Sequence, residues 1–398
     1  MTTSLIRAGS PITLRLRKPL VRDIKRGHAW LFSNAIDTPP APSGTCAIVI
    51  DSDGTKLASG IYDSTHAIPL RICRTSPPWQ LDDAWLIETL ERSIACRTRL
   101  FDSTTTGYRL VNGEGDCLPG LVIDRYANTA VIKLDGGAPQ AFYNSTAIAQ
   151  WLSHSLALES VIERSRKRGA TGETIFGPVP KQPVFFLENG MRFSADVLVG
   201  QKTGFFLDQR DNRALVRMLA DGLSVLNLFS FSGGFSVAAG LGGADHVVSV
   251  DMAQPAIDQA SKHWEINGLD KKKHLGIADD AFEFLERSAA QKRTWDLVIC
   301  DPPSFSPSEV TKQRGLDAYL RLAQLAAKVV RRGGWLALAS CSSHISMQEF
   351  ESRMLEALGR IRRSARLIAQ RALPPDHTTP LAMPELRYLK FLLLRLDN

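Results

Sequence analysis

The chain has 398 residues, of which 44% are hydrophobic and 22% are charged. This composition is typical of a globular protein and excludes a largely disordered or collagen-like chain. Since a single hydrophobic core stops growing at roughly 250–300 residues, the length predicts two or three domains. No apolar run approaches the roughly 18 residues that cross a bilayer, and the N-terminal segment lacks an apolar stretch, so we expect a cytoplasmic protein without a membrane contact.

Basic residues exceed acidic ones, 48 against 41, which gives a net charge of +7. They gather in three runs, at 7–26, 164–168 and 360–371. Any one run is explained by a solvated charged face, but three of them favour a partner that carries phosphates. The side chains that we expect to hold phosphates are Arg15, Arg17, Lys18, Lys25, Arg26, Arg166, Lys167 and Arg168.

The six cysteines are scattered along the chain, at positions 46, 73, 96, 117, 300 and 341. They form no C-x-x-C pair and no cluster with histidines at metal-ligand spacing. This pattern predicts reduced thiols, without disulfides and without a metal site.

The first part of the chain reads as short strands separated by turn residues such as Asp53-Gly54. The expected strands are Ile12–Arg17, Cys46–Asp51, Lys56–Tyr62 and Ile68–Cys73. We therefore predict a small β-rich domain over residues 1–75.

After Pro77-Pro78, apolar residues at helical spacing predict a helix over Leu81–Leu100. Further strands are expected at Tyr108–Val111, Leu121–Asp124 and Thr129–Leu134, followed by a helix over Ala141–Ser155. Residues 76–190 are thus predicted to form a mixed α/β domain.

The remaining residues, 191–398, alternate short apolar strands with helices. The expected strands are Ser224–Phe229, Val247–Asp251, Trp295–Asp301 and Trp335–Cys341. The expected helices are Ser236–Leu241, Gln254–Asn267, Ala281–Ala290, Leu316–Val330 and Ser346–Gly359. Strands of this kind form parallel sheets covered on both faces, so we predict a Rossmann-like α/β domain in which a last strand, Tyr388–Leu396, inserts antiparallel.

A glycine-rich turn, Ser230-Phe-Ser-Gly233-Gly234-Phe235, joins the first of these strands to a helix. Such a turn lets a ligand approach the backbone, and Asp251, which ends the next strand, is placed to accept both hydroxyls of a ribose. We therefore expect an adenosine-containing cofactor, with Phe229, Ser230, Gly233 and Gly234 lining its site.

The G-x-G-x-x-G pattern of dinucleotide sites is missing, and acids follow the next two strands at Asp280 and Asp301. Acids at successive strand ends repel a pyrophosphate but suit a sulfonium cation. The order of these motifs resembles that of class I S-adenosylmethionine-dependent methyltransferases. That resemblance implies that Asp280 lies near the adenine edge and Asp301 near the methyl donor.

Two reactive groups are expected at the same edge of the sheet, Asp301 within Asp-Pro-Pro-Ser-Phe and Cys341 within Ser-Cys-Ser. Carbon 5 of a pyrimidine is a poor nucleophile until a thiolate adds at carbon 6. A carboxyl group beside N3 would stabilise the charge that develops. This pairing predicts methylation of cytosine carbon 5, with Cys341 and Asp301 as the catalytic residues.

The chain resembles the ribosomal large-subunit methyltransferase I family, which methylates cytosine carbon 5 in 23S rRNA. The matching segments are Arg109–Arg125, Gly200–Arg213, the turn 230–235, Asp301–Pro303 and Ser340–Ser342. The resemblance implies a PUA domain, a central α/β domain and a C-terminal methyltransferase domain, with RNA (23S rRNA or a large-subunit precursor) as partner. It also implies cofactor contacts from Asp208, Gln209 and Arg210, and Cys341 as the nucleophile.

Two other functions remain open at this level. The Asp-Pro-Pro-Ser-Phe-Ser segment, which begins at Asp301, also resembles guanine-N7 methyltransferase domains, which have no cysteine at the position of Cys341. A non-catalytic RNA-binding assembly factor is the second alternative. The sequence leaves open whether the protein is a monomer or a homodimer.

Two residues beside the predicted site have simpler roles. Cys300 is expected to pack in the core, and Phe305 is expected either to stack on the target base or to pack.

Overall fold

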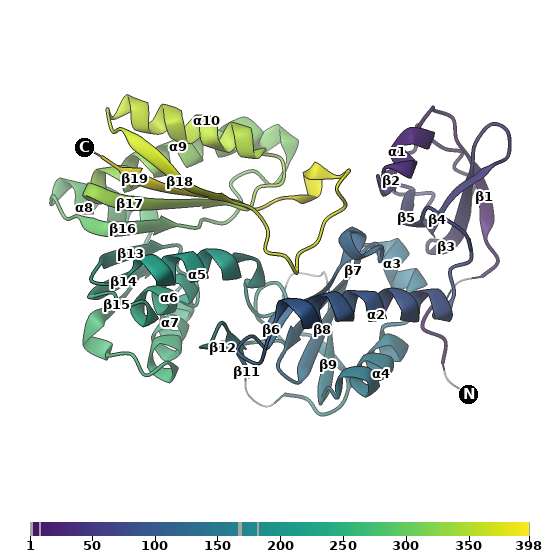
Figure 1. Cartoon of the computed structure of the whole chain (residues 1–398), viewed down its shortest axis with the longest axis horizontal. Helices are drawn as coiled ribbons and strands as arrows, with labels where there is room; N and C mark the ends of the chain where they lie inside the picture. Colours follow the sequence, from purple (N-terminus) through teal and green to yellow (C-terminus); the bar gives the residue numbers. More distant parts are fainter. Residues whose placement is uncertain (1–2, 8, 166–168, 181–182, 398) are drawn as a thin grey trace. The chain divides into compact units, whose positions relative to one another are not determined.

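The computed structural model describes residues 3–7, 9–165, 169–180 and 183–397. The chain divides into two compact units (Figure 1). Unit 1 contains Met1–Leu187, Ser194–Leu207 and Pro375–Pro384, and unit 2 contains Glu188–Phe193, Asp208–Pro374 and Glu385–Asn398. Three of the basic residues expected to hold phosphates, Arg166, Lys167 and Arg168, lie outside the described residues.

The first sheet of unit 1 has five strands in the order β1-β3-β4-β5-β2. Its elements are β1 (Ile12–Arg15), α1 (Val21–Lys25), β2 (Trp30–Leu31), β3 (Thr45–Ile50), β4 (Lys56–Tyr62) and β5 (Leu70–Arg74). Apolar side chains of its strands, among them Leu14, Val49 and Leu70, meet Ile24 of α1 in a core of their own. The β-rich fold predicted for this part of the chain is confirmed, and the short helix α1 is an element that the sequence did not predict.

The second sheet of unit 1 has the order β10-β9-β8-β7-β6. Its strands are β6 (Gly107–Asn112), β7 (Leu121–Tyr126), β8 (Thr129–Leu134), β9 (Ser160–Arg164) and β10 (Glu173–Phe176), and the helices are α2 (Asp83–Leu100), α3 (Gly137–Phe142) and α4 (Ser145–Leu156). Leu86 and Leu90 of α2 pack with Ile123 and Ile132 of the sheet, because apolar residues recur along the helix at intervals of three to four. The next two strands, β11 (Val184–Glu188) and β12 (Met191–Ala195), form a hairpin. The chain passes from unit 1 to unit 2 after Leu187, within β11, and returns to unit 1 after Phe193, within β12.

Unit 2 is built on a seven-stranded sheet in the order β15-β14-β13-β16-β17-β19-β18. The strands are β13 (Ser224–Leu228), β14 (His246–Asp251), β15 (His274–Ala278), β16 (Trp295–Cys300), β17 (Val330–Ser340), β18 (Ala365–Arg371) and β19 (Lys390–Leu396). The helices are α5 (Arg210–Leu219), α6 (Gly234–Leu241), α7 (Gln254–Ile266), α8 (Ala281–Ala290), α9 (Lys312–Val329) and α10 (Met347–Arg360). The strands from β15 to β17 pair in parallel, and β19 inserts antiparallel, as predicted. Its second antiparallel partner, β18, was not predicted.

Helices cover both faces of this sheet (Figure 1). Leu226 and Leu228 of β13 pack in one core with α8, α9 and α10, whereas Val225 packs in a second core with α5, α6 and α7. The two cores exist because successive side chains of a strand point to opposite faces, so an unbroken apolar strand fills both.

The order of the strands reverses between β13 and its two neighbours, β14 on one side and β16 on the other. At such a switch point, the loops at the carboxyl ends of the strands leave room for a ligand. This edge of the sheet carries the glycine turn, Asp251 and Asp301. The fold therefore brings the polar motifs of the sequence to one edge.

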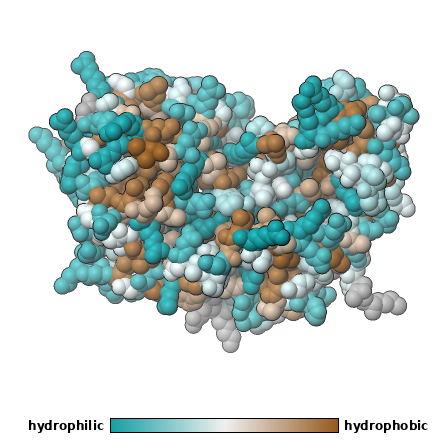
Figure 2. Space-filling model, in the orientation of Figure 1, coloured by the Kyte–Doolittle hydropathy of each residue, from teal (hydrophilic) through white to brown (hydrophobic). Residues whose placement is uncertain are grey.

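The edge strand β18 exposes apolar side chains, with Leu367 and Ile368 about half accessible. The face seen in Figure 2 is otherwise mainly hydrophilic, with brown hydrophobic areas between teal ones. None of the helices formed by the described residues is both long and apolar enough to cross a membrane.

Candidate active site

The turn after β13 has a backbone that only certain residues adopt without strain. Phe229, Phe231 and Gly233 all have positive φ, at 56°, 46° and 76°. The turn is closed by hydrogen bonds from Ser230 N to Val250 O (3.0 Å) and from Gly233 N to Ser230 O (2.8 Å). A Cβ on Gly233 would lie 2.6 Å from the Cβ of Ala260 in α7. Glycine is thus required here both by its dihedral angle and by the close approach of α7.

Asp251 is fixed by the turn that it faces. Its Oδ2 accepts a hydrogen bond from Phe231 N (2.8 Å), and its Oδ1 accepts one from Ala253 N (3.0 Å). Each carboxylate oxygen has a second acceptor position, so the half-buried group can still accept two hydroxyls from a ribose. The turn and the acid are therefore oriented together, as a ribose site requires.

His263 supports the same turn from behind. The fully buried imidazole of this α7 residue forms a 2.7 Å hydrogen bond between its Nδ1 and Ser232 O. Since a carbonyl can only accept, the proton of this bond lies on Nδ1. His263 could not be predicted from the sequence, because nothing in the local pattern of a helix marks a histidine that contacts a loop 31 residues away.

The polar groups around the turn match S-adenosylmethionine better than a pyrophosphate. Within the described part of the chain, the buried Ser230 hydroxyl has no hydrogen-bond partner, so a ligand group is free to satisfy it. Asp280 lies beyond β15, where its Oδ1 caps α8 by accepting from Phe282 N (2.9 Å) and Glu283 N (3.0 Å). Carboxylates on the strand ends favour a cation, and the turn itself contains no lysine or arginine.

Asp301 follows β16 and accepts a hydrogen bond from a residue that precedes the glycine turn in the sequence. The Gln209 amide nitrogen donates to Asp301 Oδ1 (2.9 Å), and Asn212 Nδ2 donates to Gln209 Oε1 (2.7 Å). Asp208 accepts a hydrogen bond from Tyr388 (2.7 Å), and Arg210 is 2% exposed. The structure thus brings Gln209 to Asp301, while all three expected residues of this segment are buried.

Cys341 follows β17, which pairs directly with the strand that ends at Asp301. Its half-buried Sγ donates a weak hydrogen bond, 3.9 Å long, to the carbonyl of Pro302. The next residue, Ser342, is fully buried, and its hydroxyl is hydrogen bonded to Ser304 (2.9 Å) and Tyr319 (3.0 Å). The thiol is therefore held next to the Asp-Pro-Pro loop.

Lys390 lies on β19, the strand next to β17, where it is the register partner of Ser340. Its Nζ donates to Ser342 O (2.5 Å) and Tyr388 O (2.7 Å), and the side chain is buried. Burial lowers the pKa of Lys390 to about 8. No role was predicted for Lys390 or Tyr388, because Lys390 belongs to β19 and Tyr388 lies two residues before it, so their neighbours are set by the sheet and not by sequence distance.

Two further candidates pack in the core beside the site. Cys300 is fully buried, and burial raises the pKa of its thiol. Phe305 lies in an aromatic cluster, with ring centroids 6.4 Å from Phe229, 6.1 Å from Phe282 and 4.8 Å from Tyr319. These contacts favour packing of Phe305 over stacking on a base.

Several basic residues of the runs are engaged within their own unit. Arg164 is part of β9 and donates to the carbonyls of Val197 (3.2 Å) and Gly200 (2.7 Å), so it does not belong to a solvated run. In the C-terminal run, the guanidinium of Arg360 contacts Glu356, that of Arg366 contacts Asp397, that of Arg363 contacts Val330 O and that of Arg371 contacts Asp211 O.

The N-terminal run is the more exposed one. Arg17 pairs with Asp37 (2.6 Å), and Arg15 donates to Ser52 O (3.0 Å). Lys18, Lys25 and Arg26 are exposed on or beside α1, and among the described residues no side chain or carbonyl binds their charged groups. Three of the five expected residues in this run are therefore available to an anionic partner.

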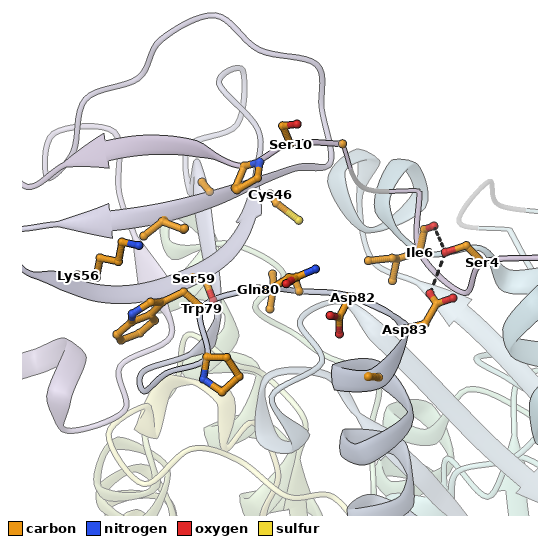
Figure 3. Close-up of a pocket in the computed structure, with 17 residues that line it drawn as sticks. Ser4, Ile6, Ser10, Cys46, Lys56, Ser59, Trp79, Gln80, Asp82 and Asp83 are labelled. Carbon is orange, nitrogen blue, oxygen red and sulfur yellow. Dashed lines mark hydrogen bonds between the residues drawn. The ribbon is translucent and has the colours of Figure 1, made fainter.

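A groove of about 960 Å³ opens in unit 1, between β3, β4 and the start of α2 (Figure 3). Lys56 and Trp79 line it together with two acids. Asp82 caps α2 by accepting from Trp85 N (2.9 Å), and Asp83 accepts from Ser4 Oγ (2.8 Å) and Leu5 N (2.9 Å). The carboxylates of Asp82 and Asp83 are thus used by the fold, and among the described residues that line the groove they form no catalytic pair.

Over the described residues, no three His, Cys, Asp or Glu side chains gather in a way that would hold a metal ion.

Two family models match the chain. Residues 143–384 match the S-adenosylmethionine-dependent methyltransferase family, and residues 14–75 match a PUA-like domain. The first match covers the glycine turn, Asp251, Asp301 and Cys341, and so agrees with the cofactor that the geometry favours. S-adenosylmethionine is the methyl donor of this protein, and the predicted cofactor is confirmed.

Full-length relatives extend the match. A protein of Deinococcus radiodurans named ribosomal RNA large subunit methyltransferase is 38% identical over 97% of this chain and 98% of its own. Ribosomal RNA large subunit methyltransferase I of Yersinia pseudotuberculosis is 34% identical over 95% of this chain and 98% of its own. A Streptococcus mutans protein described as a SAM-dependent methyltransferase has the same fold, with a TM-score of 0.84, 23% identity and coverage of 96% of this chain and 100% of its own. A methyltransferase solved in complex with SAH has a TM-score of 0.86, at 23% identity over 96% of this chain and 100% of its own. The chain belongs to the ribosomal RNA large-subunit methyltransferase I family of S-adenosylmethionine-dependent methyltransferases with an N-terminal PUA-like domain.

Proposed function

We propose that this protein methylates carbon 5 of a cytosine in large-subunit ribosomal RNA, through a covalent adduct with Cys341. The observation that carries this proposal is the position of one reduced thiol. Cys341 follows the strand next to the one that leads into Asp301, and its Sγ lies against the Asp-Pro-Pro loop. A methyl transfer to a ring nitrogen needs no such thiol, because the nitrogen lone pair is itself the nucleophile.

The proposed reaction begins when the Cys341 thiolate forms a bond to carbon 6 of the cytosine. The electron pair of the 5,6 double bond shifts toward N3, where the Asp301 carboxylic acid would donate a proton, so that a neutral enamine forms. Bound S-adenosylmethionine would supply its sulfonium methyl group to carbon 5 and would leave as S-adenosylhomocysteine. A base then removes the proton from carbon 5, the 5,6 double bond forms again as the thiolate leaves carbon 6, and the N3 proton returns to Asp301.

The residues proposed to hold the methyl donor are those at the switch point. Asp251 would accept the ribose hydroxyls, the backbone from Phe229 to Gly234 would contact the nucleoside, and Asp280 would lie near the adenine edge. The segment from Asp208 to Arg210 would also contact the donor. Gln209 also keeps the Asp301 carboxylate in one orientation.

The substrate class is supported by the names of the full-length relatives, which act on large-subunit ribosomal RNA. It is also supported by the exposed basic side chains Lys18, Lys25 and Arg26 of the PUA-like domain, which suit RNA phosphates. A cytosine inside structured RNA has to be extruded before Cys341 can reach it, which costs a few kcal/mol.

The adduct can be trapped. RNA that contains 5-fluorocytosine should form a stable covalent complex with the protein in the presence of the methyl donor, because the fluorine on carbon 5 cannot leave as a proton does. We expect the complex to migrate as one band on a denaturing gel and to map to Cys341 by mass spectrometry. Cys341→Ser should form none, whereas Cys96→Ser, which changes an exposed thiol of α2, should form as much as the unmodified protein.

The modified nucleoside identifies the base independently. Unmodified rRNA should be incubated with the protein and a labelled methyl donor and then digested. Label in 5-methylcytidine supports the proposal, and label in a methylated guanosine would replace it with the ring-nitrogen reaction. If neither nucleoside is labelled, although calorimetry shows that the donor binds and the RNA is intact, the proposal is wrong and an assembly role is favoured.

A further inference from the structure

Lys390 is an unusual lysine, because it is 2% exposed. Lysines are almost never fully buried unless they are paired, since moving an ammonium group out of water is costly. Two of its N–H groups donate to the carbonyls of Ser342 and Tyr388. Both acceptors are uncharged, so they orient the ammonium group without neutralising it.

Within the described part of the chain, no carboxylate lies within ion-pairing distance of Lys390 Nζ. Glu349 of α10 is the carboxylate whose charge raises the pKa of Lys390. It is itself paired with Lys312 (2.7 Å) and hydrogen bonded to Ser346 N. Over the residues that the structure describes, the fold therefore retains a buried cation without a carboxylate counter-ion. The ionisable group next to its anchor Ser342 is the thiol of Cys341.

We propose that the Lys390 ammonium group is the counter-ion of the Cys341 thiolate and keeps this thiol ionised near neutral pH. The inference rests on the proposed function, in which Cys341 is the nucleophile, and names the group that activates it. Lys390 acts through Cys341 and touches no substrate, so it is a positioning residue. Its two hydrogen bonds hold the loop of Cys341 and the charge in one place.

The other ionisable groups around the thiol do not serve as its counter-ion. On the loop after β16, Asp301 is an acid and disfavours a thiolate. Tyr319 of α9 has a pKa raised to about 12, mainly by burial, so it stays neutral. On α10, Glu349 has a pKa lowered to about 2, first by its hydrogen bond to Lys312, and stays anionic. His344, on the loop of Cys341, lies 3.4 Å from Glu309, which is its own acidic partner.

Lys390 and Cys341 influence each other's ionisation in a reciprocal way. Burial lowers the pKa of Lys390 to about 8, while the negative charges of Cys341 and Glu349 act in the opposite direction. Loss of the thiol proton therefore favours the charged lysine, and the charged lysine favours loss of the thiol proton. The ion pair is expected to form below the pH at which an ordinary thiol, of pKa about 8.5, ionises.

The test measures the rate at which iodoacetamide alkylates each cysteine as a function of pH, resolved by mass spectrometry of the peptides. It needs neither RNA nor methyl donor. In the unmodified protein, we expect the midpoint for Cys341 to lie at least about one pH unit below that of Cys96, the exposed thiol on α2. A midpoint equal to or above that of Cys96 would overturn the inference without any variant.

Two variants separate charge from shape. Lys390→Met keeps the length of the side chain and should raise the Cys341 midpoint by about one pH unit or more, whereas Lys390→Arg should keep it low. The Cys96 midpoint should not move in either. If Lys390→Met folds and leaves the Cys341 midpoint in place, the lysine is only structural. A low midpoint in a protein that traps no 5-fluorocytosine RNA would leave this inference standing and reject the proposed function.

Discussion

Gln209 and Asp301 are 92 residues apart in sequence, and the amide nitrogen of the first donates a 2.9 Å hydrogen bond to the carboxylate of the second. The bond links the segment before α5 to the end of β16, at the switch point of the sheet. Asn212 in turn donates to the Gln209 carbonyl and fixes which end of the amide faces the acid. The Asp301 carboxylate, which we assign to the base edge, is therefore oriented by Gln209 and Asn212 from another part of the unit.

Gln209→Leu should lower methyl transfer by about 10- to 100-fold in kcat/KM, because a hydrogen bond to a charged group contributes about 1.5–3 kcal/mol. The measurement is incorporation of label from the methyl donor into rRNA. Gln254→Leu removes an exposed amide that binds Asp258 and should leave the rate unchanged. Equal rates for Gln209→Leu and the unmodified protein would mean that Asp301 needs no such support.

Gly233→Ala should weaken binding of S-adenosylmethionine and lower the free energy of unfolding by about 1–3 kcal/mol, since the new Cβ adds strain at φ 76° and meets Ala260 at 2.6 Å. Gly268→Ala is the matched control: φ there is +70°, but a Cβ would meet nothing within 4 Å. Calorimetry with the methyl donor and urea unfolding measure the two effects. If both variants lose the same stability, the close approach of α7 has no part in the requirement for glycine.

Asp251→Asn should reduce the affinity for S-adenosylmethionine by at least about tenfold. The amide offers one acceptor oxygen, so it cannot accept from Phe231 N and Ala253 N together and still bind both hydroxyls of a ribose. Asp258→Asn, on the exposed side of α7, serves as the control for the loss of one negative charge. Unchanged affinity in a correctly folded Asp251→Asn protein would argue against the ribose contact.

Much of the candidate methyl-donor site was predictable, because its signals are local. An apolar strand, a glycine turn and an acid at the end of the next strand indicate their own positions, and β13, β14 and β16 begin and end within about one residue of the predicted limits. The antiparallel last strand was predictable in the same way, from an apolar run with no helix after it.

What the sequence did not predict depends on contacts between distant segments. Lys390 reaches Ser342 only because β19 inserts between β17 and β18, and His263 reaches Ser232 only because α7 packs behind the glycine turn. The strand β18 was missed because most of its side chains are exposed, so it lacks the apolar pattern of a buried strand. The contacts of Arg164 were missed because its place in a run of basic residues gave no sign that its side chain binds two carbonyls.

Unit 2 should become less stable in mild acid because of His274. Burial lowers the pKa of His274 from 6.5 to about 4, with a smaller effect from His246, and the ring contacts Ser249 (2.8 Å) and stacks on Trp264. The folded state therefore prefers the neutral ring, and its contribution is complete above pH 6.5 and is lost as the pH falls toward 4. We expect His274→Gln to lose less stability than the unmodified protein between pH 7 and pH 5, as measured by urea unfolding.

The control for this change is His154→Gln, an exposed histidine of α4. It should lose as much stability as the unmodified protein over the same pH interval. A pH dependence that is the same in all three proteins would mean that carboxylates alone cause the acid sensitivity.

The exposed basic side chains of the PUA-like domain should determine how RNA binding depends on salt. Each phosphate contact releases counter-ions, and the slope of log affinity against log salt is about 0.7–0.9 per contact. Replacing Lys18, Lys25 and Arg26 together by Ala should therefore weaken binding at low salt and reduce this slope by about 2–3.

The control replaces Arg360 and Arg366 by Ala, because these exposed arginines already pair with Glu356 and Asp397 and should contribute little to the slope. Fluorescence anisotropy with an rRNA fragment at several salt concentrations measures both. An unchanged slope in the triple variant would mean that the phosphate contacts lie on another surface. Three side chains that have no partner among the described residues cannot bind RNA phosphates and leave the counter-ion release unaltered.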